Sequence, residues 1–493
     1  MIQLFPFALR QELPGLGRRG LLLLGLAGLA PAAFAQSSFG PAVTYASGGT
    51  STLGVALGDV NGDGRPDIAV ASQGTDNVSV LLSLPGAAGT FGPATTYSLG
   101  AGSRPTGIAL GDVNGDGRLD IVTGNQATNA VGVLLGSAAT PGTFAAAVTY
   151  ASGGNAPNIV ALADLNGDGR LDIATANTGG NTVGVLLASA TAPGTFGMAA
   201  VYSSGGGGNP VGITTGDVNG DGRPDIVTSS NAGGTVAVLL ASATAPGTFG
   251  SGTIYSSGGA GTVGVALGDV NRDGQVDIVA TNSSSSTVSV LLGSATAPGA
   301  FAAPVTYPSG GGSPNFALLG DVNGDGLLDI VTANSASGTV GVLTGRAAAP
   351  GTFATATTYA SGGNGPIGIA LGDVNGDGRR DVVTANYNSA TVAVLLNTGT
   401  FLAAASAAAA PAISLYPNPA HGAFTLLVPA ASGAAPGQVE LLNALGQVVR
   451  RQEIALFRAE IRLAVETTGL PAGVYTVRVR AGATAATRRI VLQ

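Results

Sequence analysis

Residues 58–67 read GDVNGDGRPD, and this stretch decides how the rest of the chain is interpreted. Three aspartates and an asparagine fall within nine positions, although only 10% of the chain is charged. Nearly the same stretch returns six more times, with its first aspartate at Asp112, Asp164, Asp217, Asp269, Asp321 and Asp373. The intervals are 52 or 53 residues, and such a fixed period is the signature of a repeat architecture.

Each repeat carries short apolar segments between turn-forming residues. One repeat, residues 353–396, contains four strand-like segments at Ala354–Ala360, Ile367–Leu371, Asp381–Ala385 and Thr391–Leu396. Gly, Asn, Asp or Ser bounds each segment, as turns require. Four short strands in each of seven units predict an all-β fold, a seven-bladed β-propeller. A parallel β-helix is the alternative solenoid, but its coils are usually much shorter than such a repeat.

The two ends of the array predict how it closes. The last unit stops at Thr400-Phe401, where one more strand is expected to begin. The missing strand sequence occurs near the N-terminus as FGPAVTYA, at Phe39–Ala46. We expect this N-terminal strand to complete the last blade, because the pairing removes an exposed sheet edge.

Each acidic loop reads Asp-x-Asn-x-Asp-Gly-x-x-Asp, a pattern of hard oxygen donors. Side-chain oxygens fall at positions 1, 3, 5 and 9, a main-chain carbonyl is available at position 7, and the glycine at position 6 permits a sharp turn. This donor set predicts calcium. An EF-hand is not expected, because its twelfth position needs a glutamate and Val70 stands there. The alternative is a solvated acidic turn, since Asp, Asn and Gly are ordinary turn residues.

The charge distribution favours a bound cation. Residues 36–402 contain 22 acidic side chains, of which only Asp76 lies outside the loops, and nine arginines leave a net charge of −13. Neighbouring carboxylates repel one another by roughly 1–4 kcal/mol per pair at surface-like dielectric constants. Seven calcium ions would bring the region to +1 and turn this repulsion into attraction.

The string GDVNGDGRPDI, with LGVAL before it and VSVLL after it, resembles the FG-GAP (VCBS-type) repeat. The resemblance covers about residues 39–401, within a propeller domain predicted at 36–401. It implies a seven-bladed propeller in which calcium is structural, with up to seven sites. The loop then joins the first two strands of each blade, and position 7 gives its carbonyl. Arg272 departs from the usual glycine at position 4, which implies a weaker site.

The implied ligands are, loop by loop, Asp59, Asn61, Asp63, Arg65 and Asp67; Asp112, Asn114, Asp116, Arg118 and Asp120; Asp164, Asn166, Asp168, Arg170 and Asp172; Asp217, Asn219, Asp221, Arg223 and Asp225; Asp269, Asn271, Asp273, Gln275 and Asp277; Asp321, Asn323, Asp325, Leu327 and Asp329; Asp373, Asn375, Asp377, Arg379 and Asp381.

The sequence changes character after Phe401. Residues 402–412, LAAASAAAAPA, are typical of a linker, and residues 413–493 carry a net charge of +4 with short alternating strands that predict a small β-sandwich. The pieces YPNP at 416–419, LPAGVY at 470–475 and RRIVL at 488–492 resemble the type A sorting domain of type IX secretion. The resemblance implies that the secretion machinery is a partner of residues 413–493. An ordinary β-sandwich binding module is the alternative, and His421 is expected to be a surface residue.

Residues 1–35 are typical of a signal peptide. Arg18 and Arg19 precede an apolar run from Leu21 to Ala30, and Ala33-Phe34-Ala35 offers a cleavage site. The alternative, a membrane anchor, needs a longer apolar run. We therefore expect a bacterial protein that is secreted or attached to the cell surface, with no integral membrane span once the signal is removed.

Composition restricts the chemistry. The chain has no cysteine and no lysine, and its one histidine is His421, so catalysis in the repeats would depend on Asp76. Nucleic-acid binding is not expected, because no basic stripe occurs. We predict a non-catalytic binding or adhesion module for extracellular carbohydrate or protein. The alternatives are a self-associating surface component and, more weakly supported, a polysaccharide hydrolase or lyase.

Candidate ligand-binding residues lie away from the acidic loops, in turns rich in Gly, Ser, Thr and Asn that follow the second strand of a unit or join one unit to the next. The alternative is that these side chains only make turns. The candidates are Arg104, Asn125, Asn177, Asn231, Asn282, Asn334, Asn386 and Tyr387.

Overall fold

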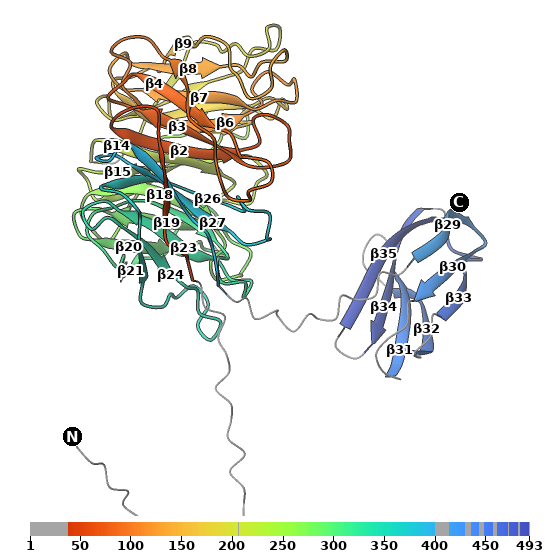
Figure 1. Ribbon diagram of the computed structural model, residues 1–493. Coiled ribbons are helices and arrows are strands. Elements are labelled where there is room, and N and C mark those ends of the chain that lie inside the picture. Colours follow the sequence, from red (N-terminus) through yellow and green to blue (C-terminus); the bar gives the residue numbers. More distant parts are fainter. Residues whose placement is uncertain are drawn as a thin grey trace, which may run out of the picture. The chain divides into compact units, whose positions relative to one another are not determined.

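The computed structural model describes residues 38–205, 207–399, 414–428, 435–442, 448–456, 461–471, 473–481 and 484–492. The predicted signal peptide at 1–35 and the predicted linker at 402–412 lie outside these ranges. Every regular element in the described residues is a β-strand, as the sequence predicts (Figure 1).

Residues 38–205 and 207–399 form seven antiparallel sheets of four strands each, which lie together in Figure 1. The first strands of the sheets are β2 (Thr52–Gly58), β6 (Pro105–Gly111), β10 (Pro157–Ala163), β14 (Pro210–Gly216), β18 (Thr262–Gly268), β22 (Pro314–Gly320) and β26 (Pro366–Gly372). The second strands are β3 (Asp67–Ser72), β7 (Asp120–Asn125), β11 (Asp172–Asn177), β15 (Asp225–Ser230), β19 (Asp277–Asn282), β23 (Asp329–Asn334) and β27 (Asp381–Asn386). The third strands are β4 (Asn77–Leu81), β8 (Ala130–Leu134), β12 (Thr182–Leu186), β16 (Thr235–Leu239), β20 (Thr287–Leu291), β24 (Thr339–Leu343) and β28 (Thr391–Leu395). The outer strands are β5 (Thr95–Ser98), β9 (Val148–Ala151), β13 (Ala200–Ser203), β17 (Thr253–Ser256), β21 (Val305–Pro308), β25 (Thr357–Ala360) and β1 (Val43–Ala46).

The last of these sheets takes its outer strand from the N-terminus. Strand β1 pairs antiparallel with β28, with Val43 opposite Val394 and Ala46 opposite Thr391. Phe39 adds an isolated bridge to Asn397. The N-terminal strand therefore pairs where the sequence predicts, and β28 is not left with an open edge.

Burial follows the position of a strand within its sheet. Every residue of the second strands is buried, as in β3, whose sequence is DIAVAS. Such nearly continuous apolar runs are typical of strands that are covered on both faces. The outer strands are mostly exposed and consist of four residues, as in β1, VTYA. The predicted segment 354–360 is therefore longer than the observed strand β25.

Seven hydrophobic clusters join neighbouring sheets in pairs, and one of them joins the first sheet to the last. That cluster contains Ile68 and Leu81 from the first sheet together with Val383 and Val394 from the last. Seven edge-to-face Tyr–Phe pairs, with ring centroids 5.2 to 5.6 Å apart, repeat along the array. Large aromatic and β-branched side chains therefore form the core between the sheets rather than within single sheets.

The C-terminal strands form one hydrogen-bonded sheet of seven strands, in the order β32-β31-β34-β35-β29-β30-β33. They are β29 (Ser414–His421), β30 (Ala423–Val428), β31 (Ala435–Leu442), β32 (Val448–Leu456), β33 (Ile461–Glu466), β34 (Gly473–Ala481) and β35 (Thr484–Leu492).

One buried cluster unites both halves of this seven-stranded sheet, including Phe424 of β30 and Val477 of β34. Strand β29 pairs with β30 through Ser414–Tyr416 and with β35 through Ala420, across an irregularity in its register. A strand that changes partners in this way joins two layers at a corner. Strand β29 therefore links the two layers of the predicted sandwich by hydrogen bonds to both. The sequence does not predict this link.

Candidate metal centres

Each acidic loop connects the first strand of a sheet to the second. In the first sheet the loop begins at Asp59, directly after β2, and ends at Asp67, the first residue of β3, which pairs with Gly58. The glycines at positions 4 and 6 have φ angles of 76° and 84°, a left-handed backbone that favours glycine. The sequence therefore folds locally into a tight turn with its ends fixed by the sheet.

The carboxylate at position 1 organises the turn through backbone hydrogen bonds. Oδ1 of Asp59 accepts from the N–H of Gly62 at 2.7 Å and of Asp63 at 3.0 Å, and Oδ2 accepts from Gly64 at 2.7 Å. The bond from the position-6 N–H to the position-1 carboxylate occurs in all seven loops.

The carboxylate at position 5 lies at the outside of the loop beside a guanidinium. Oδ2 of Asp63 accepts from the side-chain amide of Asn61 at 2.9 Å and from Arg65 at 2.6 Å. Five loops have this arginine ion pair, whereas the fifth and sixth loops carry Gln275 and Leu327 at position 7. These ion pairs are partly exposed, so each contributes little to stability.

The carboxylate at position 9 is buried and links the loop to a distant hairpin. Asp67 is 0% exposed; its Oδ2 accepts from the N–H of Val60 at 3.0 Å and its Oδ1 from the N–H of Ser83 at 2.8 Å. The same two bonds occur in each of the seven loops. This double acceptor role is not visible in the sequence, because Ser83 follows 16 residues later.

Burial raises the pKa of these position-9 carboxyls. The pKa of Asp67 is raised to about 6, because burial outweighs the hydrogen bonds from Ser83 and Val60, and the charges of Asp63 and Asp59 raise it further. Burial raises the pKa of Asp329 to about 7 for the same reasons. The remaining five are raised too: Asp120, Asp172, Asp225, Asp277 and Asp381.

The fifth loop differs from the others at position 4. Arg272 takes a φ of 62° there, where the other loops have glycine, and its guanidinium donates to the carbonyl of Gly326 in the sixth loop. A left-handed backbone costs a residue other than glycine roughly 1–2 kcal/mol. The substitution therefore strains its own loop and joins it to the next one.

The donor chemistry of the loops suits calcium, but the side chains do not converge on a common point. Among the described residues, no group of three or more Asp, Glu or His side chains is gathered closely enough to hold a metal ion. The position-1 and position-9 carboxylates bind backbone N–H groups, and the position-5 carboxylate binds arginine or asparagine. The predicted ligands of one loop thus lie within nine residues of sequence. Their carboxylate oxygens, however, form hydrogen bonds with different groups and do not face one shared position.

Five of the predicted ligand-binding asparagines are buried, which contradicts a direct role in binding. Asn177 and Asn334 donate to the backbone carbonyls of Ser152 and Ser309, and Asn386 donates to Thr391. All five are 0% exposed: Asn125, Asn177, Asn282, Asn334 and Asn386. Asn231 is partly exposed, because it follows strand β15 and so lies one position later in its repeat than the other five.

The other two candidates, Arg104 and Tyr387, lie in one polar cluster. The side-chain oxygen of Gln73 accepts from Arg104 and from the Tyr387 hydroxyl, both at 3.4 Å, while its amide donates to Gln126 at 3.2 Å. Arg104 precedes the first strand β6, so the cluster lies at the strand ends opposite the acidic loops. The two glutamines were not predicted from the sequence, although each directly follows a second strand.

Asp76, the one carboxylate outside the loops in the repeats, fixes a turn. Its Oδ1 accepts from the N–H of Arg104 at 2.8 Å and its Oδ2 from the N–H of Gly102 at 2.7 Å. The bond from Arg104 lowers the pKa of Asp76. Asp76 is therefore an ionised acceptor rather than a proton donor.

One cavity touches all seven first strands. It has a volume of about 250 Å³, and its lining is mainly apolar, including Leu53, Ile159 and Phe316. The residue equivalent to Gly54 of β2 is a glycine in five of the seven first strands, and each of these glycines lies close to the first strand of the next sheet. A Cβ on Gly54, for example, would lie 2.5 Å from the carbonyl oxygen of Thr106. Ile159 and Phe316 occupy the two remaining positions.

Comparison with protein families matches both parts of the chain. An FG-GAP-like repeat model matches residues 59–123, 164–228, 269–332 and 321–384. A secretion system C-terminal sorting domain model matches residues 414–493, which indicates export by type IX secretion. No curated protein matches the sequence. In the described part of the chain, no helix is both long enough and apolar enough to cross a membrane.

Several solved structures are similar to this chain at low sequence identity. A chain of an apo ctPRC2 complex in an autoinhibited state is 9% identical, with a TM-score of 0.52 over 74% of this chain and 98% of that one. A chain of a humanised mutant of the Chaetomium thermophilum Polycomb Repressive Complex 2 is also 9% identical, with a TM-score of 0.50 over 74% and 97%. A putative 6-phosphogluconolactonase from Bacteroides uniformis is 12% identical, with a TM-score of 0.45 over 84% and 98%. At such identities the first two likenesses concern the fold alone.

The family matches begin at the first aspartate of an acidic loop and, at the other end of the chain, at the first residue of β29. The chain is thus an FG-GAP-like repeat protein that ends in a secretion system C-terminal sorting domain.

Proposed function

We propose that the repeats form a closed, calcium-stabilised, seven-bladed β-propeller that acts as a non-catalytic binding module for carbohydrate or protein outside the cell. In this proposal residues 36–401 are the propeller, and residues 413–493 direct export. The single observation that carries it is the cavity touched by all seven first strands, because seven strands surround one cavity only when the sheets are arranged around it.

Contacts between the first and last sheets support closure. Residues of both sheets share one hydrophobic cluster, and Tyr45 of β1 packs edge-to-face on Phe91 with ring centroids 5.6 Å apart. A Cβ on Gly368 would lie 2.3 Å from the carbonyl oxygen of Leu53, the same close approach that Gly54 makes to the next sheet.

Structural calcium in the loops is supported by the buried position-9 carboxylates. Repulsion from Asp59 and Asp63 adds to the raised pKa of Asp67, and a divalent cation among these groups would reverse that repulsion. The residues that would hold the ion in the first loop are Asp59, Asn61, Asp63 and Asp67, with the carbonyl of Arg65. Binding would require Arg65 to leave Asp63. Calcium would supply no catalysis, only a link between the loop and β3.

A non-catalytic role is supported by how the titratable groups are used. Asp76 is held by two backbone N–H groups, and the loop carboxylates bind backbone, asparagine or arginine. General acid–base catalysis needs a group that exchanges a proton with the substrate near neutral pH. Burial raises the pKa of the position-9 carboxyls, to about 6 for Asp67, but these groups are not accessible to a substrate.

The ligand site in this proposal is the cluster of Gln73, Arg104, Gln126 and Tyr387. It joins residues of the first, second and last sheets, and it combines an exposed guanidinium with a phenol ring and two amides. Such groups hydrogen-bond and stack on sugars or on an extended peptide.

A glycan array with the mature full-length chain tests this assignment, with Arg104→Ala and Tyr387→Ala as site variants. Binding of related glycans that both variants weaken at least tenfold is expected. Arg346→Ala, at another exposed arginine, is the matched control. Equal binding by all three variants would exclude the cluster, and an empty array from folded protein would exclude the tested glycans as ligands.

Self-association at the cell surface is a second candidate, favoured by the outer strands. None of the seven outer strands contains a charged residue, and Val43, Val148 and Val305 are 50 to 53% exposed. Short uncharged edges of this kind can pair with other edges. Sedimentation of the full chain at increasing concentrations separates the binding module from the self-associating component. Only self-association predicts larger assemblies at higher concentration, and Val148→Lys should reduce them.

A further inference from the structure

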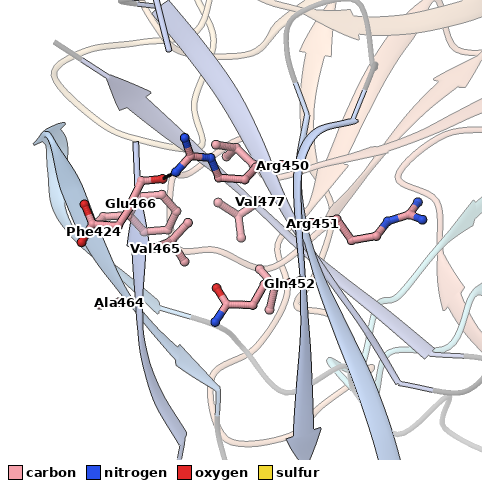
Figure 2. A pocket seen from close by; sticks show the side chains of 10 residues that line it. Phe424, Arg450, Arg451, Gln452, Ala464, Val465, Glu466 and Val477 are labelled. Atoms are coloured by element: carbon pink, nitrogen blue, oxygen red, sulfur yellow. Dashed lines mark hydrogen bonds between the residues drawn. The ribbon is translucent and has the colours of Figure 1, made fainter. Parts of the chain in front are cut away.

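The C-terminal domain contains a cavity of about 400 Å³ between its two edge strands, β32 and β33 (Figure 2). These strands are the two ends of the hydrogen-bond order, so among the described residues each of them pairs on one side only. The unpaired edges of the domain therefore border the same cavity.

The lining of the cavity places it along the backbone edges of these strands. Three consecutive residues of β32, 450–452, and three of β33, 464–466, line it. Successive side chains of a strand point to opposite faces, so three in a row line one cavity only where it runs along the edge of the strand. Unpaired backbone N–H and C=O groups at such an edge are a template for another strand.

The floor of the cavity is the apolar core of the domain. Phe424, Val465 and Val477 are buried there and lie together in Figure 2. On β32 the residues that face this core are polar: Arg450 pairs with Leu441 and Gln452 pairs with Val439. The core is thus covered on this side by two polar side chains rather than by an apolar strand.

Arg450 spans the gap at one end. Its guanidinium donates to the backbone carbonyl of Glu466, the last residue of β33, at 2.5 Å (Figure 2). It also donates to the backbone carbonyl of Thr468 at 3.0 Å. Elsewhere in the sheet, a neighbouring strand donates hydrogen bonds to backbone carbonyls. Here the Arg450 side chain donates them to carbonyls near the unpaired edge. We call this gap, lined by residues 450–452 and 464–466, the seam.

We propose that the seam is the docking site for an extended strand of the type IX secretion machinery. The inference rests on the proposed export function and specifies the surface that the machinery recognises. An extended backbone is the ligand that pairs with both unpaired edges, with its inward side chains on the apolar floor. The net charge of +4 over residues 413–493 favours acidic residues at the outward positions of that strand.

Export of the full chain from a bacterium with type IX secretion tests the proposal. Gln452→Trp fills the cavity from β32 and Ala464→Trp obstructs it from β33, while Val449→Trp, at an exposed residue of β32, is the matched control. We expect both seam variants to reduce secreted protein at least tenfold and the control to be secreted like the wild type. Melting of each variant reports folding, and the conclusion is drawn from whichever seam variant folds.

A folded seam variant that is exported at the wild-type level would overturn the proposal. Deleting residues 413–493 separates this result from a failure of the proposed function: if the deletion abolishes export, the sorting role stands and only the seam is wrong. If the deletion is also exported normally, the sorting role fails as well.

Hydrogen exchange of the full chain identifies the occupant. We expect amides of β32 and β33 to become protected when solubilised outer membrane from the secreting bacterium is added, and Gln452→Trp to abolish this change. Protection that instead rises with the concentration of the chain alone would assign the seam to a second copy and overturn the proposal.

Discussion

The carboxylate of Asp67 accepts a hydrogen bond from the backbone N–H of Ser83 at 2.8 Å, and this contact joins an acidic loop to the segment that follows the third strand of the same sheet. Asp67 also accepts a hydrogen bond from the backbone N–H of Val60 inside the loop. One buried side chain therefore holds the start of the acidic loop and the segment after the third strand. Because the pair recurs in all seven repeats, the position-9 aspartate has a structural role whether or not a metal binds.

Replacing this acceptor should destabilise the metal-free protein. In Asp67→Asn an amide N–H faces a backbone N–H, so one buried donor loses its partner at a cost of about 1–3 kcal/mol. Asp63→Asn, which removes a partly exposed ion pair with Arg65, should cost less than about 1 kcal/mol. Urea unfolding in chelator measures both variants. Equal losses for the two would contradict the buried acceptor role.

Calcium should raise the melting temperature of the full chain, and a chelator should lower it. Each site contributes about 2.7 kcal/mol when free calcium is a hundred times the dissociation constant. Calorimetry should give up to seven sites, with the fifth weaker because Arg272 occupies position 4. Magnesium is the control, because its strict octahedral geometry suits this loop less well. A melt that is indifferent to calcium would exclude the structural role.

The metal-free protein should become less stable as the pH rises from about 4 to about 7. The pKa of Asp67 is about 6 in the folded chain and about 3.8 when unfolded, so in this range the folded state binds more protons. The stabilisation is complete below the unfolded pKa and is lost as the pH passes the folded pKa. Melting in chelator at pH 4.5 and pH 7.5 tests this, and calcium should reduce or reverse the difference. A higher melting temperature at pH 7.5 in chelator would contradict it.

Closure of the ring predicts that Gly368 tolerates no side chain. A Cβ there would lie 2.3 Å from the carbonyl oxygen of Leu53, so Gly368→Ala should cost about 1–3 kcal/mol or more. At Gly197 the nearest atom to a Cβ is 3.7 Å away, so Gly197→Ala is the matched control. Unfolding curves that leave both variants at wild-type stability would mean that the first and last sheets do not pack in solution.

The N-terminal strand should be required for stability because it supplies a buried anchor. Phe39 is 7% exposed and packs edge-to-face on Tyr359 at 5.2 Å, so Phe39→Ala should cost about 3–5 kcal/mol. Met198→Ala, at a side chain that is 97% exposed, should change stability by less than about 0.5 kcal/mol. If truncation of Phe39 were as harmless as truncation of Met198, the buried Phe39 side chain would not anchor the N-terminal segment.

Much of this protein is determined by its sequence alone, because the information is local and repeated. The spacing of Asp59 and its six counterparts sets the repeat, and the apolar runs between turn residues set the strands. The sequence at Phe39–Ala46 identifies the partner of β28 because it matches the segments that end the other units. The sorting domain is likewise recognisable from short motifs, and the family comparison confirms it.

Only the tertiary structure decides which polar groups are buried and which surfaces remain open. Asn177 and Asp67 look like accessible polar residues in the sequence, yet both are buried, because neighbouring strands and sheets cover them. Gln73 meets Tyr387 across 314 residues, and β32 and β33 border one cavity because the order of strands in the sheet leaves both at its ends. Such contacts depend on how sheets pack against one another, and a pattern with a period of two residues along one strand carries no record of that packing.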